Sequence, residues 1–145
     1  MPARVFSIIA TAVLIAAAVI LMYRDALLGT GPISISLQVG GIALMVWSRL
    51  TFGLRSFHYA ANPTQGALVT AGPYRFIRNP IYAAAWLVIW TGVAVHWSAV
   101  NAVLAGTAAL TLLVRIACEE KLLRAAYPEY KEYAGRTPRL IPFVV

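Results

Sequence analysis

Four long apolar runs dominate this sequence and restrict what the chain can fold into. They cover residues 5–23, 33–47, 81–97 and 99–117, and 61% of all 145 residues are hydrophobic. An α-helix rises about 1.5 Å per residue, so a run of roughly 18 residues spans the hydrocarbon core of a bilayer. The run 81–97 is slightly short and carries several aromatic residues. The pattern therefore predicts an all-α integral membrane protein with about four transmembrane helices.

The first run poses a choice between a retained helix and a cleaved signal peptide. Arg4 precedes it and small residues such as Ala16 lie inside it, as in a secretory signal. Its apolar stretch is, however, longer than the roughly 7 to 15 residues of a signal core. We therefore expect a retained membrane span.

Turn-forming residues divide a single predicted domain, 1–145, into four parts. Gly29, Gly31 and Pro32 end the first helix, and only a few residues around 96–98 join the last two runs. Consecutive spans are therefore expected to form two antiparallel hairpins with cytoplasmic amphipathic helices after them. The parts are an N-terminal hairpin (1–50), a cytoplasmic loop (51–79), a C-terminal hairpin (80–117) and a cytoplasmic tail (118–145).

The distribution of basic residues predicts the orientation of the chain. The sequence has 12 Lys and Arg residues, and all except Arg24 fall on one side of the predicted spans. Basic residues mark the cytoplasmic side, so we expect the N-terminus, the C-terminus and the loop 51–79 in the cytoplasm. The abundance of Ala, Val and Arg favours a bacterial inner (plasma) membrane.

Composition also bears on partners and on metal chemistry. The net charge of +7 is explained by topology and by attraction to anionic lipids, so the bilayer is an expected partner and nucleic acid is not. Cys118 is the only cysteine, and no set of Cys and His residues has metal-ligand spacing. We therefore expect no internal disulfide and no metal site, and the sequence leaves the oligomeric state open.

A polar segment, residues 72–82, interrupts the apolar pattern with turn formers, tyrosines and arginines. Asn79 and Pro80 are typical of a helix start, since Asn is a preferred cap and Pro a preferred first residue. A helix N-terminus binds anions, and Arg78 adds a guanidinium fork that suits a carboxylate. The segment predicts an anion site, with a contact of Arg78 to lipid phosphate as the alternative. Its tyrosines suit either this site or the interfacial aromatic belt.

Two adjacent carboxylates, Glu119 and Glu120, follow the last apolar run in a chain with only 5 acidic residues. Arg115 and Arg124 each lie four residues from one of them, and pairs at this spacing contribute about 0.2–0.5 kcal/mol. Neighbouring helix residues point in different directions, so one carboxylate can face the anion site and accept hydrogen bonds from hydroxyl or ammonium groups. An anion site opposite such an acceptor suits a zwitterionic ligand.

These residues belong to ordered motifs between residues 68 and 142, about half of the chain. The motifs are Leu68-Val69-Thr70, Gly72-Pro73-Tyr74-Arg75, Arg78-Asn79-Pro80-x-Tyr82 and Glu119-Glu120, followed by Leu123, Tyr127, Tyr130, Tyr133, Arg136, Pro138, Arg139, Ile141 and Pro142. In this order they resemble the isoprenylcysteine carboxyl methyltransferase family, in the broad sense that includes phospholipid N-methyltransferases. That family often has His at the position of Asn79, so we expect a capping role there and no imidazole chemistry.

The resemblance implies S-adenosylmethionine as cofactor and a lipophilic acceptor, either a carboxylate or an amine, at the cytoplasmic face. Glu120 and Arg78 are the expected catalytic residues. A carboxylate acceptor needs no base, whereas a neutral amine has to lose a proton, for which Glu120 or His58 is the candidate. The residues implied to bind the cofactor are Tyr74, Arg78, Asn79, Pro80, Tyr82, Glu119 and Glu120.

Two other functions fit the same pattern. Membrane sterol-type reductases have a similar tyrosine and Arg-x-Pro region, although they are usually much longer, and they require NADPH. A membrane protein that retains the fold without catalysis is the second alternative. The cofactor that the protein binds distinguishes the three functions.

Overall fold

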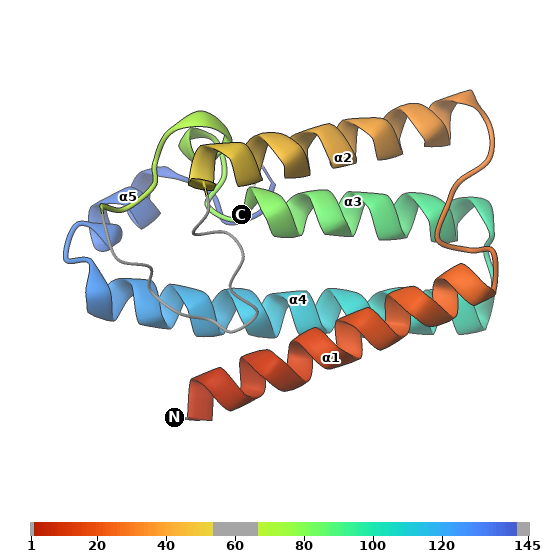
Figure 1. Cartoon of the computed structure of the whole chain (residues 1–145), viewed down its shortest axis with the longest axis horizontal. Coiled ribbons are helices and arrows are strands. Elements are labelled where there is room, and N and C mark those ends of the chain that lie inside the picture. Colours follow the sequence, from red (N-terminus) through yellow and green to blue (C-terminus); the bar gives the residue numbers. More distant parts are fainter. Residues whose placement is uncertain (1, 54–66, 142–145) are drawn as a thin grey trace.

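The computed structural model describes residues 2–53 and 67–141, and the regular structure within these ranges is helical (Figure 1). Among the described residues, three helices are long and apolar enough to cross a membrane, and a fourth apolar helix is shorter. The predicted all-α membrane architecture is confirmed. The elements are α1 (Pro2–Tyr23), α2 (Pro32–Phe52), the 3-10 helix η2 (Gly72–Arg75), α3 (Pro80–Val95), α4 (Ala99–Ala126) and α5 (Tyr130–Arg136).

The helix boundaries follow from local sequence. Proline occupies the first turn of α2 and α3, where its missing N–H removes no intrahelical hydrogen bond. Before α4, the side chain of Ser98 accepts a hydrogen bond from the N–H of Asn101 at 3.1 Å. α4 then continues past the apolar run to Ala126, so its last turns carry the charged residues that the sequence places in the tail.

The four long helices lie side by side in the spatial order α1, α4, α3, α2 (Figure 1). α3 and α4 form the predicted C-terminal hairpin through the short turn at residues 96–98. α1 and α2 run antiparallel, as expected, but α1 packs along α4 and α2 packs along α3. The connection 24–31 crosses one end of the bundle, and this lets each N-terminal helix pack against a helix of the other hairpin (Figure 1).

The apolar core lies toward the end of the bundle that carries this connection. Small side chains in it allow close helix packing. Most of the large exposed hydrophobic residues lie on α1 and α2, as expected for surfaces that contact lipid. The buried members of the core are Ala17, Leu21, Ala26, Ile89, Val93, Ala105 and Ala108.

A buried glutamine fixes the connection 24–31 over the core. Nε2 of Gln38 donates to the carbonyl oxygens of Leu27 at 2.9 Å and Val88 at 3.0 Å. Its Oε1 accepts a hydrogen bond from the N–H of Gly29 at 3.0 Å. Backbone groups in a membrane need protein partners of this kind, because the hydrocarbon offers none.

Gly92 in α3 lies directly against this connection. A Cβ atom at Gly92 would lie 2.1 Å from the carbonyl oxygen of Leu27 and 2.7 Å from that of Ala26. Both atoms belong to backbone, which cannot rotate away as a side chain does. At Gly106 in α4, by contrast, no atom of the described chain beyond the adjacent residues and the helix's own backbone lies within 4 Å of the same position.

We predict that Gly92→Ala lowers the thermal unfolding temperature of the protein in detergent, because overpacking a tight site costs about 1–3 kcal/mol. Gly106→Ala is the matched control, since Ala is favoured over Gly in a helix interior by up to about 1 kcal/mol. Equal unfolding temperatures for the two variants would contradict the close packing of the connection on α3.

Candidate functional site

Polar residues gather at the other end of the bundle, where α3 begins and α4 ends (Figure 1). After α5, the chain returns to the start of α3. The N–H of Arg78 donates to the carbonyl oxygen of Pro138 at 2.9 Å, and the N–H of Asn79 donates to that of Arg139 at 3.1 Å. These bonds join two motifs that lie far apart in the sequence.

The carboxylate of Glu120 lies at the centre of this end, and its side chain is 3% exposed. Oε1 lies 3.3 Å from Nε of Arg78 and accepts a hydrogen bond from Nε of Arg139 at 3.3 Å. Oε2 accepts from Nη2 of Arg139 at 3.1 Å and from Nη2 of Arg124 at 3.5 Å. A buried carboxylate needs such partners, because desolvation of an unpaired charge is costly.

Three guanidinium groups surround this single carboxylate and leave an excess of positive charge. Arg78 is held inside, with its side chain 10% exposed and its Nη1 donating to the carbonyl oxygen of Ala134 at 2.7 Å. The side chains of Arg139 and Arg124 are 41% and 56% exposed. The accessible positive charge at the predicted anion site therefore comes mainly from Arg139 and Arg124.

Asn79 occupies the N-cap position of α3, as predicted, but its side chain forms no capping hydrogen bond. Nδ2 donates instead to the carbonyl oxygen of Arg139 at 3.2 Å and to Oε1 of Glu120 at 3.4 Å. The predicted capping role of this side chain is therefore wrong. The physical reason is that both hydrogen bonds of Nδ2 orient the amide toward Glu120 and the segment after α5 rather than toward the first turn of α3.

Glu119 points away from Glu120, as the sequence predicts for neighbours on a helix. Its Oε1 accepts hydrogen bonds from the hydroxyl of Tyr82 and from Nη2 of Arg115, the latter at 3.0 Å. Nε of Arg115 also donates to the hydroxyl of Tyr82 at 3.1 Å, and its Nη1 donates to Oγ1 of Thr11. This second polar cluster connects α1, α3 and α4.

Tyr74 in η2 is buried and takes part in the support of the site. Its carbonyl oxygen accepts a hydrogen bond from the hydroxyl of Tyr133 in α5 at 2.6 Å. Burial raises the pKa of Tyr133 to about 12, so this hydroxyl stays protonated at neutral pH. The hydrogen bond holds α5 against η2.

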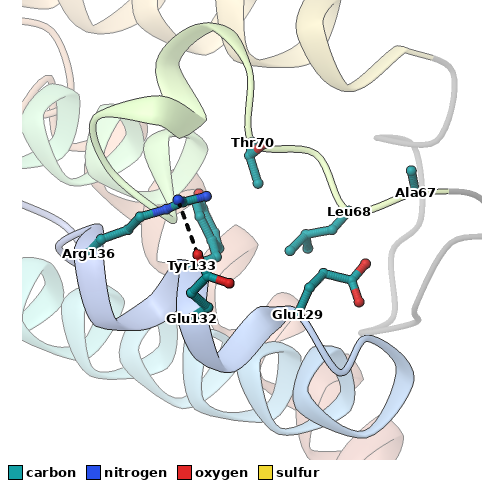
Figure 2. Close-up of a pocket in the computed structure, with 7 residues that line it drawn as sticks. All are labelled: Ala67, Leu68, Thr70, Glu129, Glu132, Tyr133 and Arg136. Atoms are coloured by element: carbon teal, nitrogen blue, oxygen red, sulfur yellow. Dashed lines mark hydrogen bonds and ion pairs between the residues drawn. The ribbon is translucent and has the colours of Figure 1, made fainter.

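A cavity of about 200 Å³ lies beside these clusters, between α5 and the segment that leads into η2 (Figure 2). Leu68 and Thr70 lie on one side, and four residues around α5 form the other (Figure 2). Ligand cavities usually measure about 300–1,000 Å³, so this one has room for only part of a drug-sized ligand. The lining residues are Ala67, Leu68, Thr70, Glu129, Glu132, Tyr133 and Arg136.

The structure places Arg78, Asn79 and Glu120 in one cluster and Tyr82 and Glu119 in a second, and Pro80 begins α3. Tyr74 lies in neither cluster and contacts Tyr133 instead. Both predicted pairs on α4, Arg115–Glu119 and Glu120–Arg124, are present. Thr11 is a contributor that the sequence did not indicate, because a single hydroxyl in an apolar run carries little signal. His58 lies outside the described residues. Within those residues, no group of three or more His, Cys, Asp and Glu side chains could hold a metal ion.

We predict that Glu120→Gln destabilises the protein by about 3 kcal/mol, because removing one partner of a buried ion pair leaves the other charge uncompensated. Glu132→Gln is the control, since Glu132 and Arg136 form an exposed pair, which contributes at most about 1 kcal/mol. Thermal unfolding in detergent measures both variants. A Glu120→Gln protein as stable as Glu132→Gln would show that the arginine cluster does not depend on this carboxylate.

Three proteins of known description are similar to this chain. The cobalt-zinc-cadmium resistance protein of Cupriavidus metallidurans is 36% identical over 112 residues, which is 77% of this chain and 50% of that protein. The nickel-cobalt-cadmium resistance protein of Alcaligenes xylosoxydans xylosoxydans is 31% identical over 103 residues, or 70% of this chain and 46% of that protein. The methanethiol S-methyltransferase of Crocosphaera subtropica is 35% identical over 72 residues, which is 49% of this chain and 28% of that protein.

The chain spans about half the length of the two resistance proteins. No solved structure matches it significantly. The sequence model of the phospholipid methyltransferase family matches residues 31–130, which is more than half of the chain. This match confirms the resemblance carried by the motifs, and the chain belongs to the phospholipid methyltransferase family.

Proposed function

We propose that this protein is an S-adenosylmethionine-dependent methyltransferase that acts on a lipophilic acceptor at the cytoplasmic face of a bacterial inner membrane. Family membership and the similarity to a methanethiol S-methyltransferase support transfer of a methyl group. The observation that carries the proposal is the contact between two motifs. Residues 78–82 and 119–120 meet at hydrogen-bond distance at one end of an apolar bundle.

The donors and acceptors at this end suit the zwitterionic part of the cofactor. Arg139 and Arg124 offer accessible guanidinium groups for its carboxylate. Carboxylate oxygens accept hydrogen bonds from ammonium and ribose hydroxyl groups. The proposed cofactor-binding set remains Tyr74, Arg78, Asn79, Pro80, Tyr82, Glu119 and Glu120, to which the geometry adds Arg139 and Arg124.

When bound, S-adenosylmethionine supplies an electrophilic methyl group. The residues of the chain orient the ligand and exclude water, which are the main contributions that such a displacement needs. Glu120 and Arg78 hold the clusters in place, and both oxygens of Glu120 are already occupied by donors. This geometry favours an organising role for the pair over proton transfer by Glu120. A base role for His58 stays a prediction.

We propose three chemical classes of methyl acceptor. The family description names phospholipids, and one relative is named for methanethiol, so an amine headgroup and a thiol join the carboxylate as acceptors to test. A carboxylate needs no base, whereas a neutral amine or thiol has to lose a proton. The lipid-facing apolar surfaces of α1 and α2 suit an acceptor that arrives through the bilayer.

We predict saturable one-site binding when S-adenosylhomocysteine is titrated into the detergent-purified protein in a calorimeter. Arg139→Ala should weaken this binding about tenfold or more, because a hydrogen bond to a charged group contributes about 1.5–3 kcal/mol. Arg75→Ala is the control, since Arg75 is exposed and lies over the ring of Phe76 at 5.7 Å.

The absence of S-adenosylhomocysteine binding by folded protein would overturn the proposed function. Binding of NADPH in its place would support the reductase alternative. Binding of neither ligand would support a membrane protein that retains the fold without catalysis.

A further inference from the structure

The two adjacent glutamates differ in how much of each carboxylate is available. Both oxygens of Glu120 are engaged by arginines, and its side chain is 3% exposed. The side chain of Glu119 is 26% exposed, and both of its hydrogen bonds are made by Oε1. In the part of the chain that the structure describes, Oε2 of Glu119 has no hydrogen-bond partner. Each oxygen of a carboxylate can accept a hydrogen bond, so Oε2 can accept one from a ligand.

The groups that hold Oε1 of Glu119 also set the orientation of Oε2. Tyr82 from α3 and Arg115 from α4 both donate to Oε1, which fixes the rotation of the carboxylate. Arg115 is itself held by Tyr82 through two contacts. Its Nε donates to the hydroxyl of Tyr82 at 3.1 Å, and its guanidinium carbon lies 5.7 Å from the centre of the Tyr82 ring.

A residue of α1 makes the remaining contact to Arg115. Oγ1 of Thr11 accepts a hydrogen bond from Nη1 of Arg115 and donates its own hydrogen to the carbonyl oxygen of Ser7 at 2.7 Å. The hydroxyl of Thr11 therefore cannot turn freely, and it directs the guanidinium of Arg115. α1 precedes residues 31–130, so this support lies outside the region that the family model matches.

We propose that Thr11, on α1, acts through Arg115 to position the carboxylate of Glu119, so that Oε2 of Glu119 accepts a hydrogen bond from the bound cofactor. S-Adenosylhomocysteine carries an ammonium, ribose hydroxyls and an adenine amino group as hydrogen-bond donors, and the ammonium and the ribose hydroxyls are the donors that we expect to meet Glu119. Within the proposed cofactor-binding set, Glu120 then contributes by holding the arginines in place, and Glu119 contacts the ligand directly. This inference rests on the proposed function, because it needs the same cofactor at the same end of the bundle.

The first test compares two ligands on Glu119→Gln. Calorimetric titration should show S-adenosylhomocysteine binding about tenfold to a hundredfold more weakly than to the wild type, because a charge-assisted hydrogen bond is lost. 5′-Methylthioadenosine keeps the ribose but lacks the amino-acid ammonium. If Glu119→Gln no longer weakens binding of this ligand, the donor is the ammonium; if it still does, the donor is on the adenosine part, a ribose hydroxyl or the adenine amino group.

The second test examines the positioning role of Thr11. Thr11→Val keeps the shape of the side chain but cannot accept from Arg115, so it should weaken S-adenosylhomocysteine binding several-fold. Thr11→Ser restores the hydroxyl and should bind within about twofold of the wild type. Thr107→Val is the matched control, since the exposed hydroxyl of Thr107 bonds only within α4, to Val103 at 2.9 Å. Thermal unfolding of each variant shows whether the protein is folded.

The outcomes separate this inference from the proposed function. If the folded wild type does not bind S-adenosylhomocysteine, both are overturned. If the wild type binds and Glu119→Gln binds equally well, Glu119 does not meet the ligand. If Thr11→Val binds as tightly as Thr107→Val, or if Thr11→Ser fails to restore binding, the positioning role is wrong. If Glu119→Gln does not fold, the Thr11 pair alone decides the inference.

Discussion

The buried carboxylate of Glu120 holds separate parts of the chain together at the polar end of the bundle. It lies on α4, and its arginine partners come from the start of α3, from α4 itself and from the segment after α5. A carboxylate at 3% exposure is stable as an ion only because these donors replace the water that it has lost. The return of the C-terminal segment to α3, and with it the placement of α5 and η2, depends on the same cluster.

The two ends of the bundle are built from different interactions. At one end small apolar residues, Gln38 and Gly92 press the connection 24–31 against the helices. At the other end ion pairs and hydrogen bonds join α3, α4 and the C-terminal segment. At the first end the polar side chains of Arg24 and Asn101 bond to each other, whereas the arginine cluster at the second end carries an excess of positive charge. Ligand chemistry is therefore expected at the polar end, where the family motifs also lie.

Much of the fold and part of the site were predictable from the sequence. The membrane helices follow from the lengths of the apolar runs, because the bilayer thickness sets those lengths. The pairs Arg115–Glu119 and Glu120–Arg124 follow from helix periodicity. The predicted capping by Asn79 is absent, since its amide is oriented by hydrogen bonds to Glu120 and to the carbonyl oxygen of Arg139. The sequence pattern also could not predict which helices pack against each other, because lipid-facing and helix-facing apolar residues have the same chemistry.

By itself, the sequence determined that this protein is a helical membrane protein, that its polar residues gather on one side, and that its motifs belong to a methyltransferase family. These properties are local, because hydropathy, charge and motif order are carried by neighbouring residues. Only the tertiary structure decided that α1 packs on α4, that Arg139 reaches Glu120 and that Thr11 contacts Arg115. It also decided that Glu120 is enclosed while Oε2 of Glu119 has no hydrogen-bond partner among the described residues. The reason is physical. Whether a carboxylate can bind a ligand depends on the donors that other helices bring within about 3 to 4 Å of it. The residues next to the carboxylate in the sequence do not specify which donors these are.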